Sequence, residues 1–531
     1  MSQTTQTEVI IIGAGPTGLS LACQLVRYGI NFIIIDKSAG VTSYSKALGV
    51  HARTLEIYDQ LGIASQAVEQ GTIAGKVRLL AGSKVRGEMD LSTLGQGLSQ
   101  YPYMLVLEQS RNERLLYDYL QVHGEDVLWQ TELGSFSQSA DHVTVNVENA
   151  AGQSTSIEAK YLVGCDGPKS PVRHSLGLEF TGSTFERLFY VADVQIDWQF
   201  SHDALHVCLA KNSGMAFFPM PGANRYRIVG AFPEGVAKDE GETHFNEIEQ
   251  EIRAQSGIEL QISRVNWFST YKVHTRHVEK FSKQRCFLAG DSAHIHTPAG
   301  GQGMNTGIQD AYNLAWKLAF VLRGRANPSI LDSYNAERLP NAEHLLRTTD
   351  RMFNLVSGSG WLLSFMRTRV IPPLAKYIVN LRVVRNRFFP LISQIGISYR
   401  HSILSRHDAD KNFTVKAGDR MPYFMVDGIN VYDYLHATKF HLLHFSNTPV
   451  DDSIKDGMLK EYSDMLDYRA LPLHSMVTRA FGTKQAFMVL LRPDNYIGFI
   501  SAEVLAEQVE SYLNEVIGVH GPHPAQQAKG E

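Results

Sequence analysis

Cysteine is scarce in this sequence. The only four are Cys23, Cys165, Cys208 and Cys286, which are widely scattered and form no CxxC pair. This pattern excludes a disulfide scaffold and dithiol exchange, and no Cys/His spacing suits a zinc site. We therefore expect reduced core thiols in a cytoplasmic protein that holds no metal.

An excess of positive charge and long hydrophobic runs are also absent. The chain has 50 Lys and Arg against 54 Asp and Glu, a net charge of -4, so we expect no nucleic-acid partner. No run reaches the roughly 18 uninterrupted apolar residues that a transmembrane helix requires. The first residues, MSQTTQTEV, lack the basic and apolar regions of a secretory signal. We expect neither an integral membrane segment nor a leader.

The composition is that of an ordinary globular protein. Of the 531 residues, 44% are hydrophobic and 20% are charged, which supports a sizeable core and argues against long disorder. A chain of this length should divide into two or three packed units.

The first informative pattern is a strand, a glycine-rich turn and a helix. The apolar run Val9–Ile12 breaks into GAGPTG and continues as a helical pattern, and a second run, Phe32–Ile35, ends at Asp36. Glycines at such a turn let the backbone approach a pyrophosphate at the helix N-terminus, while Asp36 is placed to accept ribose hydrogen bonds. This pattern predicts a dinucleotide site but does not choose between NAD and FAD. Its candidate residues are Gly13, Gly15, Pro16, Thr17, Gly18, Asp36 and Lys37.

A second glycine-rich segment makes that choice. A buried strand at residues 285–289 leads into GDSAHIHTPAGGQGMN and then into a helical pattern. Asp291 can bond a ribityl hydroxyl, and the amides of GGQGMN at a helix start suit the pyrimidine edge of an isoalloxazine, which gains negative charge on reduction. We therefore expect FAD, held on this side by Gly290, Asp291, Pro298, Gly301, Gly303, Met304 and Asn305.

Together these segments resemble the class A flavoprotein monooxygenases, in particular the phenol and polyketide hydroxylase branch, and the similarity covers essentially the whole chain. GCDGPKSPVR at 164–173 is similar to the family's DG motif, which implies that Asp166 lies near both the flavin and the reduced pyridine nucleotide. The resemblance also implies flavin contacts for Gln109, backbone contacts to adenine for Leu133, and a role for Lys46, where an arginine is more usual. Arg53 is a second basic candidate, with a solvated helix face as its alternative.

The patterns and the resemblance imply an α/β fold with three parts: a Rossmann-type FAD-binding domain, an inserted antiparallel-sheet substrate domain, and a C-terminal thioredoxin-like domain without CxxC. Linking helices lie between the end of the FAD-binding domain and the C-terminal domain, and we leave open whether they are plain packing helices or touch a membrane surface. The expected ranges are 1–75, 105–185 and 270–345 for the FAD domain, 76–104 and 186–269 for the substrate domain, 346–400 for the linking helices and 401–531 for the last domain.

The resemblance implies a reaction in which NADPH or NADH reduces FAD and a flavin C4a-hydroperoxide oxygenates a phenolic or polycyclic aromatic substrate with O2. Baeyer-Villiger insertion, epoxidation and antibiotic inactivation stay open, as do a flavin reductase or desaturase and a non-enzymatic flavin scaffold. Phe217, Phe218, Pro219 and Met220 are candidates to line the substrate cavity or to pack the core. His51, His294 and His296 are candidate bases or structural histidines, so no catalytic residue is assigned. The sequence leaves homodimer formation open.

Overall fold

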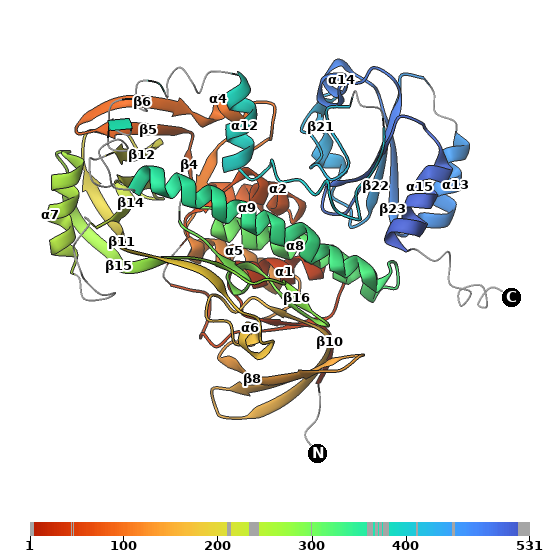
Figure 1. Cartoon of the computed structure of the whole chain (residues 1–531), viewed down its shortest axis with the longest axis horizontal. Helices are drawn as coiled ribbons and strands as arrows, with labels where there is room; N and C mark the ends of the chain where they lie inside the picture. Colours follow the sequence, from red (N-terminus) through yellow and green to blue (C-terminus); the bar gives the residue numbers. More distant parts are fainter. Residues whose placement is uncertain are drawn as a thin grey trace.

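A computed structural model gives the fold (Figure 1). It describes residues 5–43, 45, 47–209, 214–232, 244–298, 300–357, 365, 366, 370, 374, 382–409, 413–448 and 452–518. The long helices α8 (Gly303–Leu322) and α9 (Asp332–Ser357) cross the middle of the view in Figure 1. An eight-stranded sheet lies to their left and the C-terminal unit, in blue, to their upper right. The predicted α/β fold class is confirmed.

The first sheet carries the predicted strand-turn-helix-strand unit. Its central path runs β16-β17-β10-β1-β2, and strand β1 (Thr5–Ile12) lies parallel to both β2 (Phe32–Ile35) and β10 (Ser154–Gly164). Strand β17 (Cys286–Leu288) joins parallel to β10, so the strand predicted at 285–289 belongs to the same sheet. Helix α1 (Pro16–Arg27) packs against α8 beside this sheet. The two glycine-rich segments therefore follow β1 and β17, which lie parallel on either side of β10, and leave the sheet at the same edge.

The first sheet also has an antiparallel extension. Strand β9 (Val143–Asn149) pairs antiparallel with β10 and with β8 (Thr131–Gln138), extending the parallel core at one side. The sheet also includes the short strand β16 (Ser282–Lys283). Its strands β1, β2 and β10 are almost wholly apolar where both faces are covered, as expected for a buried parallel sheet.

The second sheet is the predicted covering sheet, in the order β18-β15-β11-β14-β13-β12-β5-β6. Its two longest strands, β11 (Thr181–Asp197) and β15 (Gln261–His277), pair antiparallel and extend beyond the expected range 186–269. Helix α7 (Phe245–Ser256) packs Ile248 and Ile252 into the core on one face. The other strands are β5 (Lys76–Ala81), β6 (Lys84–Asp90), β12 (Ala204–Leu209), β13 (Gly214–Pro219), β14 (Arg225–Ala231) and β18 (His294–Ile295).

Short elements fill the space around the sheets. Strands β3 (Gly49–Val50), β4 (Thr72–Ala74) and β7 (Met104–Val106) form a small sheet of their own. The helices are α2 (Ala52–Gln60), α3 (Ala64–Gln70), α4 (Leu91–Gly95), α5 (Gln109–Val122), α6 (Pro171–Ser175), η1 (Gly290–Ser292) and η2 (Pro328–Leu331).

The C-terminal unit is built on a sheet of order β19-β25-β24-β22-β23, in which β22 lies parallel to β23 and antiparallel to β24. The chain runs through β22 (Phe440–Phe445), α13 (Asp452–Tyr462), β23 (Leu466–Leu471), α14 (Ser475–Phe481), β24 (Phe487–Leu491), β25 (Ile497–Ser501), α15 (Ala506–Tyr512) and η5 (Leu513–Ile517). Strand β19 (Arg406–Asp408), the hairpin of β20 (Met425–Val426) and β21 (Ile429–Asn430), and η4 (Val431–Tyr434) complete it. The assignment of this unit as thioredoxin-like stays a prediction.

The predicted linking segment is only partly described. Within 346–400 the structure gives the end of α9 and helix α12 (Arg382–Ile392), and most residues between them lie outside the described part. Most of the segment for which contact with a membrane surface was left open therefore lies outside it, as do residues 519–531. No helix among the described residues is long and apolar enough to cross a membrane.

A buried polar network joins the C-terminal unit to α8 and α9. The guanidinium of Arg492 donates to both carboxylate oxygens of Glu337 at 2.6 and 3.1 Å and pairs with Asp494. Lys317 Nζ donates to Glu337 at 2.8 Å, and Trp316 Nε1 donates to Asp494 at 3.0 Å. These residues are at most 3% exposed, so each charge depends on its partners inside the protein.

Arg492→Ala tests this network. The substitution leaves the carboxylates of Glu337 and Asp494 buried without their guanidinium, which we expect to lower the free energy of unfolding by about 3–5 kcal/mol. Urea unfolding measures the change. The control is Arg400→Ala, whose half-exposed side chain pairs with Asp419 at 2.7 Å and should cost under about 1 kcal/mol. Equal losses for the two variants would contradict the prediction.

Candidate functional site

The turn after β1 is shaped by glycines. Gly13 has φ +102°, and a Cβ there would lie 2.5 Å from the backbone oxygen of Cys165, at the end of β10. A Cβ on Gly18 would collide with the backbone oxygen of Gly13. Gly15 differs, because a Cβ there would meet nothing within 4 Å. The first two glycines close the turn against the protein, while Gly15 faces open space at the N-terminus of α1, where backbone amides favour an anion.

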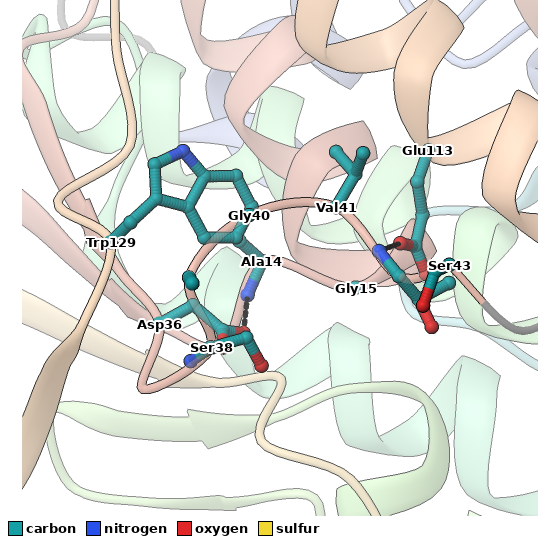
Figure 2. Close-up of a pocket in the computed structure, with 11 residues that line it drawn as sticks. Ala14, Gly15, Asp36, Ser38, Gly40, Val41, Ser43, Glu113 and Trp129 are labelled. Carbon is teal, nitrogen blue, oxygen red and sulfur yellow. Dashed lines mark hydrogen bonds between the residues drawn. The ribbon is translucent and has the colours of Figure 1, made fainter.

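A cavity of about 420 Å³ opens beside this turn (Figure 2), within the size range of small-molecule sites. Figure 2 shows the Trp129 ring beside Ala14 and Asp36, with Glu113 at the far end of the cavity. The segment after β2 curves around the cavity between them. The lining residues are Ala14, Gly15, Asp36, Ser38, Ala39, Gly40, Val41, Thr42, Ser43, Glu113 and Trp129.

Asp36 holds the turn in place as well as lining the cavity. Its carboxylate accepts hydrogen bonds from the backbone N–H of Ala14 at 2.7 Å and of Ser38 at 2.8 Å. A carboxylate has about four acceptor sites, so capacity for a ribose hydroxyl is left. Lys37 is exposed and is not among the lining residues. The cofactor roles of Asp36 and Lys37 stay predictions.

The two glycine-rich segments touch at Thr17. A Cβ on Gly290 would lie 2.5 Å from Thr17 Oγ1, and a Cβ on Gly307 would collide with the same oxygen. Gly290 also has φ +65°, which favours glycine. The sequence interpretation that both segments serve one cofactor requires such closeness, and the fold provides it.

The turn after β17 is anchored from α8. The backbone N–H of Gly290 donates to Asp310 Oδ2 at 3.0 Å, and Ser292 Oγ donates to the backbone oxygen of Gly164 at 2.6 Å. The Asp291 side chain is exposed, so a ligand can reach it. Its predicted bond to a ribityl hydroxyl stays a prediction.

Asn305 ties the start of α8 to the segment 49–54. Its Oδ1 accepts from the His51 backbone N–H at 2.9 Å and from Thr54 Oγ1 at 2.7 Å, while its Nδ2 donates to the oxygens of Gly49 and Gly301. The side chain therefore uses both of its donors and both acceptor positions inside the protein. What remains for a cofactor at this position is backbone, because the first N–H groups of a helix have no acceptor within it. Gly303 and Met304 share that position, and Pro298 and Gly301 belong to the loop before it.

The predicted DG motif lies beside the first turn. A Cβ on Gly13 would be 2.9 Å from the Cα of Asp166, which follows β10. Asp166 Oδ2 accepts from the Val172 backbone N–H at 3.0 Å, whereas Oδ1 is buried without a hydrogen-bond partner among the described residues. Burial raises the pKa of this carboxyl. An unsatisfied buried acceptor at this edge is consistent with a ligand that supplies a donor.

Each of the three histidine candidates has a structural hydrogen bond. His51 Nε2 lies 2.9 Å from the oxygen of Gly300, and burial lowers its pKa to about 4. His294 Nε2 lies 2.7 Å from Asp310 in the core. His296 Nδ1 lies 2.6 Å from the oxygen of Thr297, burial lowers its pKa to about 4, and its other nitrogen lies near Gly303. These contacts favour the structural alternative for all three.

The remaining candidates fall in different places. Gln109 Oε1 accepts from the Ala47 backbone N–H at 3.1 Å and its Nε2 donates to Glu113, so it borders the cavity. Leu133 packs against the core and is not among the lining residues. Lys46 lies outside the described residues. Arg53 is buried between the aromatic rings of Tyr312 and Tyr496, so the alternative of a solvated helix face is wrong.

Three of the four substrate-cavity candidates divide between two apolar clusters, and Pro219 belongs to neither. Phe217 packs beneath α7 with the core of the sheet. Met220 and Phe218 instead join an apolar cluster with Leu48, Ala74, Val106 and Met104. A Cβ on the adjacent Gly49 would lie 3.4 Å from Met104 Sδ and 3.8 Å from the oxygen of Gly301. This apolar cluster, defined by these six side chains, therefore adjoins the loop before α8.

Trp129 and Glu113 line the cavity but belong to none of the predicted motifs. Trp129 reaches it because Leu128 forms a bridge with Ile35 beside β2. Glu113 reaches it from α5 and accepts from the Thr42 backbone N–H at 2.8 Å. Neither residue has a sequence signal of its own. The amphipathic pattern that buries one face of α5 is the only indication that Glu113 faces inward.

The geometry fits a flavin dinucleotide. The open position at Gly15 and the helix start behind it suit a pyrophosphate, and the cavity with Asp36 and Trp129 suits the adenosine half. The second segment, packed on the first at Thr17, presents the start of a twenty-residue helix to the other half. Two glycine-rich segments that meet beside one parallel sheet are the arrangement expected of an FAD-dependent enzyme.

Comparison with known proteins supports the assignment of a flavin site. The model of the FAD binding domain family matches residues 6–349, and the chain belongs to that family. It is 33% identical to a flavin-dependent monooxygenase of Mycobacteroides abscessus, over 96% of this chain and all of that one. It is 28% identical to the pentachlorophenol 4-monooxygenase of Sphingobium chlorophenolicum, over 96% of this chain and 97% of that one.

A solved structure shares the architecture. The anhydrotetracycline hydroxylase OxyS from Streptomyces rimosus matches with a TM-score of 0.75 and 28% identity, over 97% of this chain and 99% of that one. The resemblance found in the sequence is thus confirmed, and the protein is an FAD-dependent monooxygenase.

Gly15→Ala separates cofactor binding from folding. The new Cβ meets no protein atom within 4 Å but enters the space assigned to the pyrophosphate. We expect the FAD dissociation constant to rise about ten-fold or more, since close backbone approach is what this glycine allows. Fluorescence titration of the apoprotein measures it. The control Gly75→Ala also adds a Cβ in open space, away from the cavity, and should bind FAD as the wild type does. Unchanged affinity in Gly15→Ala would refute the pyrophosphate assignment.

The buried His51 should make the free energy of unfolding fall in acid. Because burial lowers its pKa to about 4, the unfolded chain, with a histidine pKa near 6.5, binds a proton that the folded chain does not. Stability should therefore fall between pH 6.5 and 4, by about 3 kcal/mol at pH 4 from this group. His51→Gln keeps a donor for Gly300 but cannot titrate, so its unfolding free energy should depend less on pH in that window. Parallel pH profiles from urea unfolding would contradict this account.

Proposed function

We propose that this protein uses NADPH or NADH and O2 to hydroxylate a phenolic or polycyclic aromatic compound. The observation that carries the proposal is the contact of the two glycine-rich segments at Thr17, which gives one flavin two binding segments in a chain of the monooxygenase family. Two of the relatives act, by name, on a chlorinated phenol and on a polycyclic tetracycline precursor. Location in the cytoplasm, where reduced nicotinamide is available, belongs to the same proposal.

The apolar cluster supports an aromatic substrate. Its members come from the loop before β3, from β4 and β7, and from the end of β13, so two sheets contribute to it. It meets the loop before α8 through Gly49 and Gly301. Apolar walls next to the place proposed for the flavin ring suit a flat hydrocarbon skeleton and keep water away from it.

Bound FAD supplies the redox and oxygen chemistry that no amino-acid side chain offers. The protein binds and orients the flavin and the substrate. The amides at the start of α1, beside Gly15, hold the pyrophosphate, while Asp36 and Trp129 hold the adenosine half. The amides at the start of α8 orient the pyrimidine edge and stabilise negative charge there. The apolar cluster positions the substrate ring and excludes water. All residues in these roles belong to one chain, so a homodimer would not be needed to complete the site.

The decisive experiment is turnover with labelled oxygen. Purified protein should carry FAD, its oxidation of NADPH or NADH should accelerate with phenols or polycyclic aromatics, and the product should gain one ¹⁸O from ¹⁸O2 on a ring carbon. Protein without flavin, or reduced nicotinamide consumption that no aromatic compound stimulates, would overturn the proposal. Label inserted into a carbon–carbon bond would indicate Baeyer-Villiger chemistry instead. A reduced or desaturated product without label would indicate a reductase or desaturase.

A further inference from the structure

We propose that Tyr399, Arg338 and Asp310 form a positioning chain through which the C-terminal unit sets the Gly290–Asp291 turn of the flavin site. None of the three side chains lines the cavity described above. The inference rests on the proposed FAD site but not on oxygen transfer.

Asp310 is the inner member of the chain. It is fully buried in α8, and its Oδ2 accepts from the Gly290 backbone N–H at 3.0 Å and lies 2.7 Å from His294 Nε2. Burial alone would raise the pKa of Asp310, but Arg338 and His294 outweigh it and hold the pKa below its ordinary value. Asp310 is therefore a carboxylate that only accepts, and Gly290 depends on it for its hydrogen bond.

Arg338 is the middle member. From α9 its Nε donates to Asp310 Oδ1 at 2.6 Å, its Nη2 to the Thr306 backbone oxygen at 3.2 Å, and its Nη1 to Tyr399 Oη at 2.8 Å. The side chain is fully buried. A rigid guanidinium with three separate acceptors fixes the angle between Asp310, the first turns of α8 and Tyr399 at once.

Tyr399 is the outer member and is held by the C-terminal unit. Its backbone N–H donates to the oxygen of Gly418 at 2.7 Å. Its ring lies 4.3 Å from that of Tyr496, centroid to centroid, and 5.4 Å from the guanidinium of Arg492. Three hydrogen bonds in series thus connect a hydroxyl fixed by the C-terminal unit to the backbone of Gly290.

The Gly290 turn has little freedom to adjust. Asp310 accepts the hydrogen bond of its backbone N–H on one side. On the other side Thr17 Oγ1 lies 2.5 Å from the place where a Cβ on Gly290 would stand. A shift of Asp310 therefore moves the turn relative to Thr17 and to the start of α1. In the proposed site this changes the spacing between the two segments that hold the flavin.

Two tyrosine variants form a matched pair. Tyr399→Phe removes the oxygen that accepts from Arg338 and leaves a buried guanidinium N–H unpaired. Tyr496→Phe makes the same chemical change in the adjacent buried ring, whose hydroxyl has no hydrogen-bond partner among the described residues. Loss of ring packing is absent from both.

Three readouts test the proposal. Hydrogen exchange in the apoprotein should accelerate at the Gly290 amide in Tyr399→Phe, because Asp310 is held less firmly. The FAD dissociation constant should rise about five-fold or more, the lower end of couplings between distinct protein sites. The reduction potential of the bound flavin should also become more negative, since the start of α8 is less well aligned with the negative charge of the reduced flavin. Tyr496→Phe should match the wild type in all three.

The outcomes separate this inference from the proposed function. Wild-type behaviour of Tyr399→Phe would overturn the positioning chain, and so would equal changes in both variants, which would indicate ring packing instead. If the wild type binds no FAD, the proposed function fails, while exchange at Gly290 still decides whether the chain of hydrogen bonds acts as inferred. Arg338→Lys should be intermediate, because it keeps the charge but loses the three-pronged geometry.

Discussion

Helix α8 is buried along most of its length, so its polar side chains must find partners inside the protein. The rest of the structure is arranged around this requirement. Asp310 accepts a hydrogen bond from the backbone N–H of Gly290, in the turn of the proposed flavin site. Asn313 and Lys317 donate to Glu337 of α9, and Trp316 donates to Asp494 of the C-terminal unit. Each partner comes from a different part of the chain, so satisfying one helix fixes the position of three units.

The proposed flavin site is consequently built more from backbone than from side chains. Gly15 contributes open space, and the start of α8 contributes amides whose helix is held in register by Asn305. The charged and aromatic groups nearby mainly hold these pieces: Asp36 accepts from Ala14, and His51 donates toward Gly300. Backbone amides anchored in this way supply fixed dipoles that need not reorganise when a flavin gains charge.

Local patterns predicted the parts of the site that depend on local sequence. The run Val9–Ile12, the GAGPTG turn and the strand near 286 are each recognisable because a buried strand followed by a glycine-rich turn has its own composition. Contacts between distant residues have no such signature. The sequence left a solvated helix face open for Arg53, yet this side chain is covered by Tyr312 and Tyr496, which lie hundreds of residues away.

The interface with the C-terminal unit is polar at its centre, and this has a consequence for what the unit does. Apolar residues of similar size would often stabilise a buried contact as well as ion pairs do, but they tolerate sliding. Arg492 permits little sliding, because its guanidinium must bond Glu337 and Asp494 at the same time. A unit without cysteines cannot perform dithiol exchange, whereas a unit locked at one angle can hold α8 and α9 in place. Its charged interface therefore argues for a supporting role in the flavin enzyme itself.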